Sequence, residues 1–276
     1  MFLALNYSPQ AVRLVQSGQI KIDYFKTPDW DWLIRQATTI HPVAVHFTLE
    51  AGNGSISQID WKQVDRLSQL TGTPYINVHL DPRQLHYPEI SVDTQSDADV
   101  KRVYRVMLTD VMQLVDHFGA ERIIVENSPY RGEPGNTLRL CVEPEILTRL
   151  IEETGCGFLL DISHAIISSR YINMDTYEYF SRLPTHTIRE MHFAGIHRLN
   201  GQWIDHLSIL KADWRWLDWV FMRIHMGEWS QPWLLAFEYG GIGTAFEWRC
   251  APGVIAKQVP MLYQRVCELN ARLSAL

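Results

Sequence analysis

The chain has 276 residues, of which 46% are hydrophobic, and carries a formal net charge of −6 at pH 7. This composition permits one large domain with a substantial core, and no run of Lys or Arg marks a nucleic-acid-binding surface. Nucleic acid is therefore not expected as a partner.

The four cysteines form no C-x-x-C pair, and a chain of this length needs no disulfide staples, so we expect reduced thiols. The first residues lack the basic and apolar regions of a signal peptide. No apolar run reaches the ~18 residues of a transmembrane helix. We therefore expect a cytoplasmic protein without a membrane partner.

Short apolar runs alternate along the chain with longer segments of helical periodicity. The expected strands are residues 2–6, 20–25, 42–47, 75–80, 122–127, 157–162, 188–193 and 233–238. The expected helices are residues 9–17, 29–39, 60–70, 96–118, 143–154, 174–182, 213–227 and 253–275. Gly119 and Gly155 stand where a left-handed residue ends a helix, and Pro144 stands near a helix start.

Near-continuous apolar strands separated by helices are typical of a parallel sheet that is covered on its outer face. Eight such units predict an α/β fold, a closed (β/α)8 TIM barrel that forms a single domain over residues 1–276. A doubly wound open sheet is the alternative, but its G-x-G-x-x-G fingerprint is absent after the first strand. Two long connections, residues 80–95 and 194–212, follow strands, where barrels build their active face.

Ligand-type side chains stand at the ends of six of the eight expected strands. These six residues are His46, His79, Glu126, Asp161, His192 and Glu238. Three further polar residues follow in the adjoining segments, namely His164, Asp205 and His206. Because the carboxyl ends of barrel strands open on one mouth, we expect all nine side chains to converge there.

Four carboxylates packed together without cations would repel one another. None of the nine residues is Lys or Arg, and the nearest arginines (Arg83, Arg131, Arg170 and Arg198) lie in expected loops. Divalent metal ions neutralise carboxylates and bind neutral imidazoles, so a metal centre is the favoured interpretation over a metal-free polar pocket. Nine ligands exceed the needs of one ion, so two or three are expected; iron, zinc and manganese all suit them.

Other polar residues carry weaker expectations. Asp81 follows His79 closely enough to orient an imidazole. The Gly-rich segment 238–243 follows the last strand, where barrels often bind phosphate, although such turns usually have no ligand. His197 is open to either role, and the remaining histidines are interpreted as surface or supporting residues: His41, His86, His117, His186 and His225.

The order of these ligands resembles the xylose-isomerase-like TIM-barrel superfamily. One similar branch is the endonuclease-IV-type group, whose trinuclear zinc site includes a D-x-x-H motif. The other is the barrel family that includes the methanobactin biosynthesis oxidase, the multinuclear non-heme iron-dependent oxidative enzymes. The phrases IIVENSPY, FLLDISHAIIS, MHFAGIH and LLAFEYGG are most similar to this second branch, and the likeness spans about residues 40–240.

One departure concerns the usual Asp-x-His pair of the family, because Asp205 and His206 are adjacent here. Either the connection bulges at this point, or one of the two residues is not a ligand. The third metal ion depends on the answer.

The resemblance implies an iron-dependent oxidase that uses O2 to oxidise a peptide or a small molecule, with a separate partner protein in the peptide-modifying members. One alternative is a divalent-metal sugar isomerase or epimerase, in which the catalytic residue Glu126 or Glu238 moves a proton. Another is a zinc-dependent phosphodiester hydrolase, although the net acidity argues against a DNA substrate. A metal-binding protein without catalysis stays open as well.

Overall fold

The computed structural model describes residues 1–275 and divides the chain into two compact units. Unit 1 comprises Met1–His46, Arg66–Thr73 and Arg189–Leu276, and unit 2 comprises Phe47–Asp65 and Pro74–Ile188. Helix α3 (Trp61–Thr71) is shared between the units. The expectation of a single domain stays a prediction.

Unit 1 is built on parallel strands in the order β3-β2-β1-β11-β8. These strands are β1 (Phe2–Asn6), β2 (Tyr24–Pro28), β3 (Val43–His46), β8 (Ile188–Phe193) and β11 (Leu234–Phe237). An antiparallel hairpin of β9 (Gly195–Leu199) and β10 (Gln202–Leu207) follows β8. The helices are α1 (Pro9–Gln16), α2 (Asp31–Thr38), α8 (Trp214–His225) and α9 (Pro252–Leu273).

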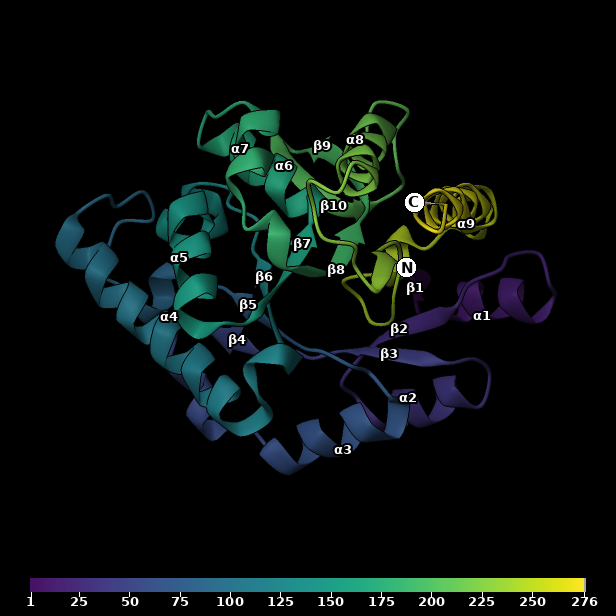
Figure 1. Ribbon diagram of the computed structural model, residues 1–276, viewed down its shortest axis with the longest axis horizontal. Coiled ribbons are helices and arrows are strands. Elements are labelled where there is room, and N and C mark those ends of the chain that lie inside the picture. Colours follow the sequence, from purple (N-terminus) through teal and green to yellow (C-terminus); the bar gives the residue numbers. More distant parts are fainter. Residues whose placement is uncertain (276) are drawn as a thin grey trace. The chain divides into compact units, whose positions relative to one another are not determined.

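Unit 2 is built on parallel strands in the order β4-β5-β6-β7. These strands are β4 (Glu50–Ala51), β5 (Ile76–Leu80), β6 (Ile123–Asn127) and β7 (Gly157–Asp161). Its helices are α4 (Asp97–Phe118), α5 (Pro144–Thr154), α6 (Ile162–Tyr171) and α7 (Thr176–Arg182), and Figure 1 shows β5, β6 and β7 in sequence beside α4 and α5. Short 3-10 turns lie at Ser55–Gln58, Gln84–His86, Ala120–Arg122, Glu133–Gly135, Arg139–Val142, Thr185–Thr187 and Glu247–Arg249.

The apolar runs explain why these strands form, because every residue of β6 and β7 is buried. Strands buried on both faces favour continuous runs such as Ile123–Val125 over alternation. Pro144 occupies the first turn of α5, and Gly155 ends that helix with φ 69° and ψ 10°, as expected. Gly119 also has a positive φ of 88°, but its ψ of 140° is not left-handed helical, so that expectation is wrong in detail.

Several expected boundaries are wrong. The strand expected at residues 20–25 is β2 at Tyr24–Pro28, because Ile20 and Ile22 are buried in the turn after α1 instead of in the sheet. Helix α6, the short strand β4 and the β9–β10 hairpin were not expected at all. The hairpin occupies the connection 194–212 that the sequence left without regular structure.

A carboxylate on α4 fixes the segment that follows β4. Oδ2 of Asp110 accepts hydrogen bonds from the backbone N–H groups of Gly52, Asn53 and Gly54, at 2.8, 3.2 and 2.9 Å. Asp110 is only 1% exposed. The three N–H groups therefore take the place of the water molecules that would otherwise hydrogen-bond this carboxylate.

We expect Asp110→Ala to lower the free energy of unfolding by about 2–3 kcal/mol, because three donors lose a charged acceptor. Urea denaturation followed by circular dichroism measures the effect. Asp116→Ala on the exposed side of the same helix is the matched control and should change stability by less than about 0.5 kcal/mol. Equal stability of the two variants would contradict this role of Asp110.

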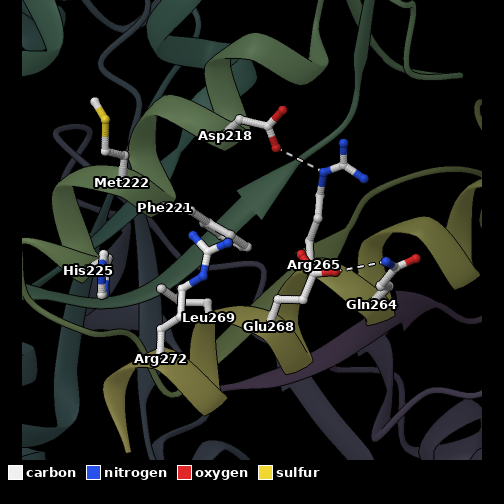
Figure 2. Close-up of a pocket in the computed structure, with 9 residues that line it drawn as sticks. All are labelled: Asp218, Phe221, Met222, His225, Gln264, Arg265, Glu268, Leu269 and Arg272. Atoms are coloured by element: carbon white, nitrogen blue, oxygen red, sulfur yellow. Dashed lines mark hydrogen bonds and ion pairs between the residues drawn. The ribbon is translucent and has the colours of Figure 1, made fainter. Parts of the chain in front are cut away.

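A cavity of about 420 Å³ lies between α8 and α9 in unit 1 (Figure 2). Arg265 Nε donates to Asp218 Oδ1 at 2.9 Å across it, and Gln264 Nε2 donates to Glu268 Oε1 at 2.8 Å along α9. No residue expected as a metal ligand lines this cavity.

Over residues 1–275, no helix combines the length and the apolar character that crossing a bilayer requires.

Candidate metal centre

Four of the expected ligands lie together in unit 2. His79 on β5 stands opposite Glu126 on β6 in the strand register, and its Nε2 lies 3.1 Å from Glu126 Oε2. Nδ1 of His164 lies 3.8 Å from the other carboxylate oxygen, Oε1. Glu126 is 1% exposed, so its carboxylate is shielded from bulk solvent beside these two imidazoles.

Asp161 stands at the junction of β7 and α6 and has two structural roles. Its Oδ1 accepts a hydrogen bond from the backbone N–H of His164 at 2.7 Å, which makes it the N-cap of α6. The side chain of Asn127 makes two hydrogen bonds to the backbone of Asp161. Its Oδ1 accepts from the Asp161 N–H at 2.9 Å, and its Nδ2 donates to the Asp161 carbonyl oxygen at 3.0 Å. A carboxylate therefore ends this buried strand because a helix begins there.

His164 presents a defined nitrogen to this set. Its Nδ1 lies 2.8 Å from the backbone carbonyl of Asn127, which can only accept, so Nδ1 carries the proton. Nε2 then offers its lone pair and lies 3.6 Å from Asp161 Oδ2. Glu126, Asp161 and His164 each place one ligand atom within 4.8 Å of the others. A histidine fixed by a carbonyl in this way is typical of metal sites.

The other five expected ligands (His46, His192, Asp205, His206 and Glu238) lie in unit 1. His192 is fully buried, with Nε2 3.0 Å from Glu190 Oε1 and Nδ1 3.2 Å from Glu238 Oε1. A neutral imidazole has one N–H, so it directs a lone pair at one of these carboxylates. A cation or an added proton removes that repulsion, and the donor set therefore fits a divalent ion.

The adjacent residues Asp205 and His206 lie in a β-bulge of the hairpin. The register of β10 against β9 shifts between Ile204 and Leu207, and His206 has φ 57°, which is uncommon for a residue with a side chain. His206 Nδ1 lies 3.6 Å from Glu238 Oε2, and its Nε2 lies 4.0 Å from Asp205 Oδ1. Neighbours in a regular strand point to opposite faces, whereas this bulge brings both side chains to one side.

Sequence reasoning missed Lys26, the third residue of β2. Its Nζ forms an ion pair with Oε1 of Glu238, and both side chains are 6% exposed. The expected strand 20–25 ended one residue before it. The sequence places nearby cations only in expected loops, whereas Lys26 lies in a strand.

The electrostatics of Glu238 follow from this pair. Burial alone would raise the pKa of Glu238, but the Lys26 ammonium and the nearby imidazoles hold that pKa well below its ordinary value. The imidazoles that contribute belong to His192, His206 and His46. Glu238 is accordingly ionised and available as an anionic ligand.

The weaker expectations have mixed outcomes. Asp81 pairs with Arg83, at 2.5 Å from Nη2, and accepts from Thr137 Oγ1 at 2.9 Å, so its expected role in orienting an imidazole is wrong. His197 Nε2 lies 2.7 Å from the carbonyl oxygen of Ser208. This contact links β9 to the residue that follows β10. The Gly-rich segment 238–243 receives a hydrogen bond from Asn6 Nδ2 to Gly240 O at 3.1 Å.

Comparison with known proteins identifies the family. Residues 24–226 match the family model described as RiPP precursor modification enzyme MbnB/TglH/ChrH. The chain belongs to this family. A UPF0276 protein of Chromobacterium violaceum is 34% identical over 105 residues, which cover 37% of this chain and 37% of that relative. The suspected family is thus confirmed, and its description is that of enzymes that modify RiPP precursors.

Two solved structures share the fold. A D-psicose 3-epimerase in the presence of D-fructose has a TM-score of 0.58 at 8% identity, covering 97% of each chain. The mannonate dehydratase of Streptococcus suis has a TM-score of 0.57 at 10% identity, covering 100% of this chain and 95% of that one. At these identities the likeness shows the fold alone. It confirms the predicted α/β fold of the TIM-barrel type.

Proposed function

We propose that this MbnB/TglH/ChrH family member is an iron-dependent oxidase that acts on a peptide or a small molecule. The observation that carries the proposal is the unit 2 set of Glu126, Asp161 and His164, whose ligand atoms lie within 4.8 Å of one another. Membership of a family that modifies peptide precursors supports a peptide substrate. The five ligand-type residues of unit 1 are proposed as a second metal-binding set.

The donor types support iron. The two sets contain imidazoles and carboxylates but no cysteine. This combination is typical of reactive sites that bind Fe²⁺, Mn²⁺ or Zn²⁺, whereas structural zinc sites usually contain cysteine. Bound iron would supply the redox chemistry with O2, and the protein supplies position and charge.

Glu126 and Glu238 are the proposed catalytic carboxylates. Each is buried beside imidazoles, with Glu126 Oε2 3.1 Å from His79 Nε2 and Glu238 Oε1 3.2 Å from His192 Nδ1. A carboxylate that lies beside the substrate group can accept the proton that this group releases during oxidation. The side chain of His79 beside Glu126 is 26% exposed, and that of His206 beside Glu238 is 21% exposed, so each carboxylate has one neighbouring imidazole that reaches solvent.

Metal replacement tests the proposal directly. We expect chelator-treated protein to lose oxygen consumption in the presence of a cysteine-containing precursor peptide, and Fe²⁺ to restore it under reducing conditions. Zn²⁺ and Mn²⁺ should bind without restoring turnover, because neither supplies the same redox couple with O2. An oxygen electrode measures the oxygen consumption, and mass analysis of the peptide measures its modification.

Two results would replace the oxidase proposal. Turnover of a sugar with Mn²⁺ in the absence of O2 would indicate an isomerase or epimerase. Cleavage of a phosphodiester with Zn²⁺ would indicate a hydrolase.

A further inference from the structure

Lys26 is an unusual residue for its position. Among the residues that the structure describes, it is the one Lys or Arg side chain that is buried. Its neighbours Phe25 and Thr27 in β2 are fully buried as well, so Lys26 lies in a buried part of the strand. Burial of a charge is costly unless a partner compensates it, and the partner here is Glu238 Oε1.

Lys26 contacts the carboxylate oxygen that a cation beside His192 would also use. Glu238 Oε1, which Lys26 contacts, is also the oxygen that lies 3.2 Å from His192 Nδ1. A cation placed between that nitrogen and that oxygen would share Oε1 with the ammonium group. Oε2, which lies 3.6 Å from His206 Nδ1, has no such competitor in the described contacts.

Charge counting gives the same result. Three buried carboxylates belong to this part of unit 1: Glu190, Asp205 and Glu238 are 7%, 5% and 5% exposed. Lys26 offsets one of these three negative charges. Without Lys26, the same set would favour additional positive charge.

We propose that Lys26 acts as a built-in cation of the unit 1 ligand set, which occupies Glu238 Oε1 and competes there with a divalent ion. The inference rests on the metal-dependent function proposed above. It assigns Lys26 a positioning role, because the ammonium group holds Glu238 in one orientation and leaves Oε2 as the metal-facing oxygen.

Removal of the charge tests this role. Lys26→Met deletes both the charge and the donor, Lys26→Gln keeps a donor without the charge, and Lys26→Arg keeps the charge. Lys21→Met is the matched control, since Lys21 is an exposed lysine shortly before β2 whose Nζ lies 5.0 Å from the Tyr263 ring centre. Metal-free protein is dialysed against graded Co²⁺, and bound cobalt per chain is measured by elemental analysis.

We expect Lys26→Met and Lys26→Gln to bind one further Co²⁺ per chain, or to bind Co²⁺ at least about tenfold more tightly than the wild type. Lys26→Arg and Lys21→Met should match the wild type. If Lys26→Met does not fold without metal, Lys26→Gln carries the test, because its amide can still donate to Glu238.

The outcomes separate the two proposals. Normal Co²⁺ binding by the wild type, with unchanged or weaker binding by Lys26→Gln, overturns the role of Lys26 and leaves the metal-dependent function standing. A wild-type chain that binds no Co²⁺ overturns the metal-dependent function, and the role of Lys26 with it.

Discussion

Glu126→Gln is expected to lower metal affinity of the unit 2 set by at least about 100-fold, and enzymatic turnover with it. The substitution keeps the shape of the side chain but removes the charge that lies 3.1 Å from His79 Nε2 and 3.8 Å from His164 Nδ1. Loss of a supporting residue alone typically costs 10–100-fold in metal affinity, and a direct ligand costs more. Elemental analysis of protein purified in parallel measures the loss.

Glu152→Gln provides the control for this experiment. Glu152 lies on the exposed side of α5 in the same unit, so the same chemical change occurs away from the ligand set. It should leave metal content at the wild-type level. Wild-type metal content in Glu126→Gln would remove Glu126 from the set of ligands.

The second large effect concerns Glu238→Gln. We expect this variant to lower the free energy of unfolding of the metal-free protein by about 3–5 kcal/mol, because Lys26 remains buried without its anionic partner. The variant also loses an anionic ligand next to His192 and His206, so metal binding to the unit 1 set should fall. Denaturation in guanidinium chloride in the presence of a chelator measures the change in stability separately from the change in metal binding.

A double variant separates these two effects. Lys26→Met combined with Glu238→Gln has no unpaired buried charge, so most of the lost stability should return. Metal binding should not return, since the ligand is still missing. A Glu238→Gln protein as stable as the wild type, or a double variant with wild-type metal binding, would contradict the account of this pair.

The sequence predicts the strands of this fold well where they are buried on both faces. Runs such as Ile123–Val125 and Phe158–Leu160 are dense, and the strands lie within one residue of the expected limits. The run at Ile20–Phe25 misled the expectation because its first apolar residues pack in a turn, and the strand itself contains a lysine. Tertiary packing decides such cases, and a single sequence does not contain that information in a local pattern.

The candidate ligands could be named from the sequence because His, Asp and Glu rarely end a buried strand without a partner. The local geometry of these ligands could not be predicted from the sequence. The N-cap role of Asp161 depends on α6, which the pattern did not indicate, and the bulge at Asp205 and His206 depends on hairpin pairing. Lys26 meets Glu238 across 212 positions of sequence, a contact that no spacing rule predicts.

Convergence of the unit 1 and unit 2 sets on one another stays a prediction, as do the native metal and the number of ions. The cytoplasmic location and the partner protein stay predictions as well.

The measurement that tests the central claim most directly is anomalous X-ray scattering from crystals of protein purified without added metal, together with elemental analysis of the same sample. The account predicts iron in the protein and an anomalous peak about 2.0–2.3 Å from carboxylate oxygens of Glu126 and Asp161 and from Nε2 of His164. Protein that contains no metal ion, or peaks that lie away from these three side chains, would contradict it.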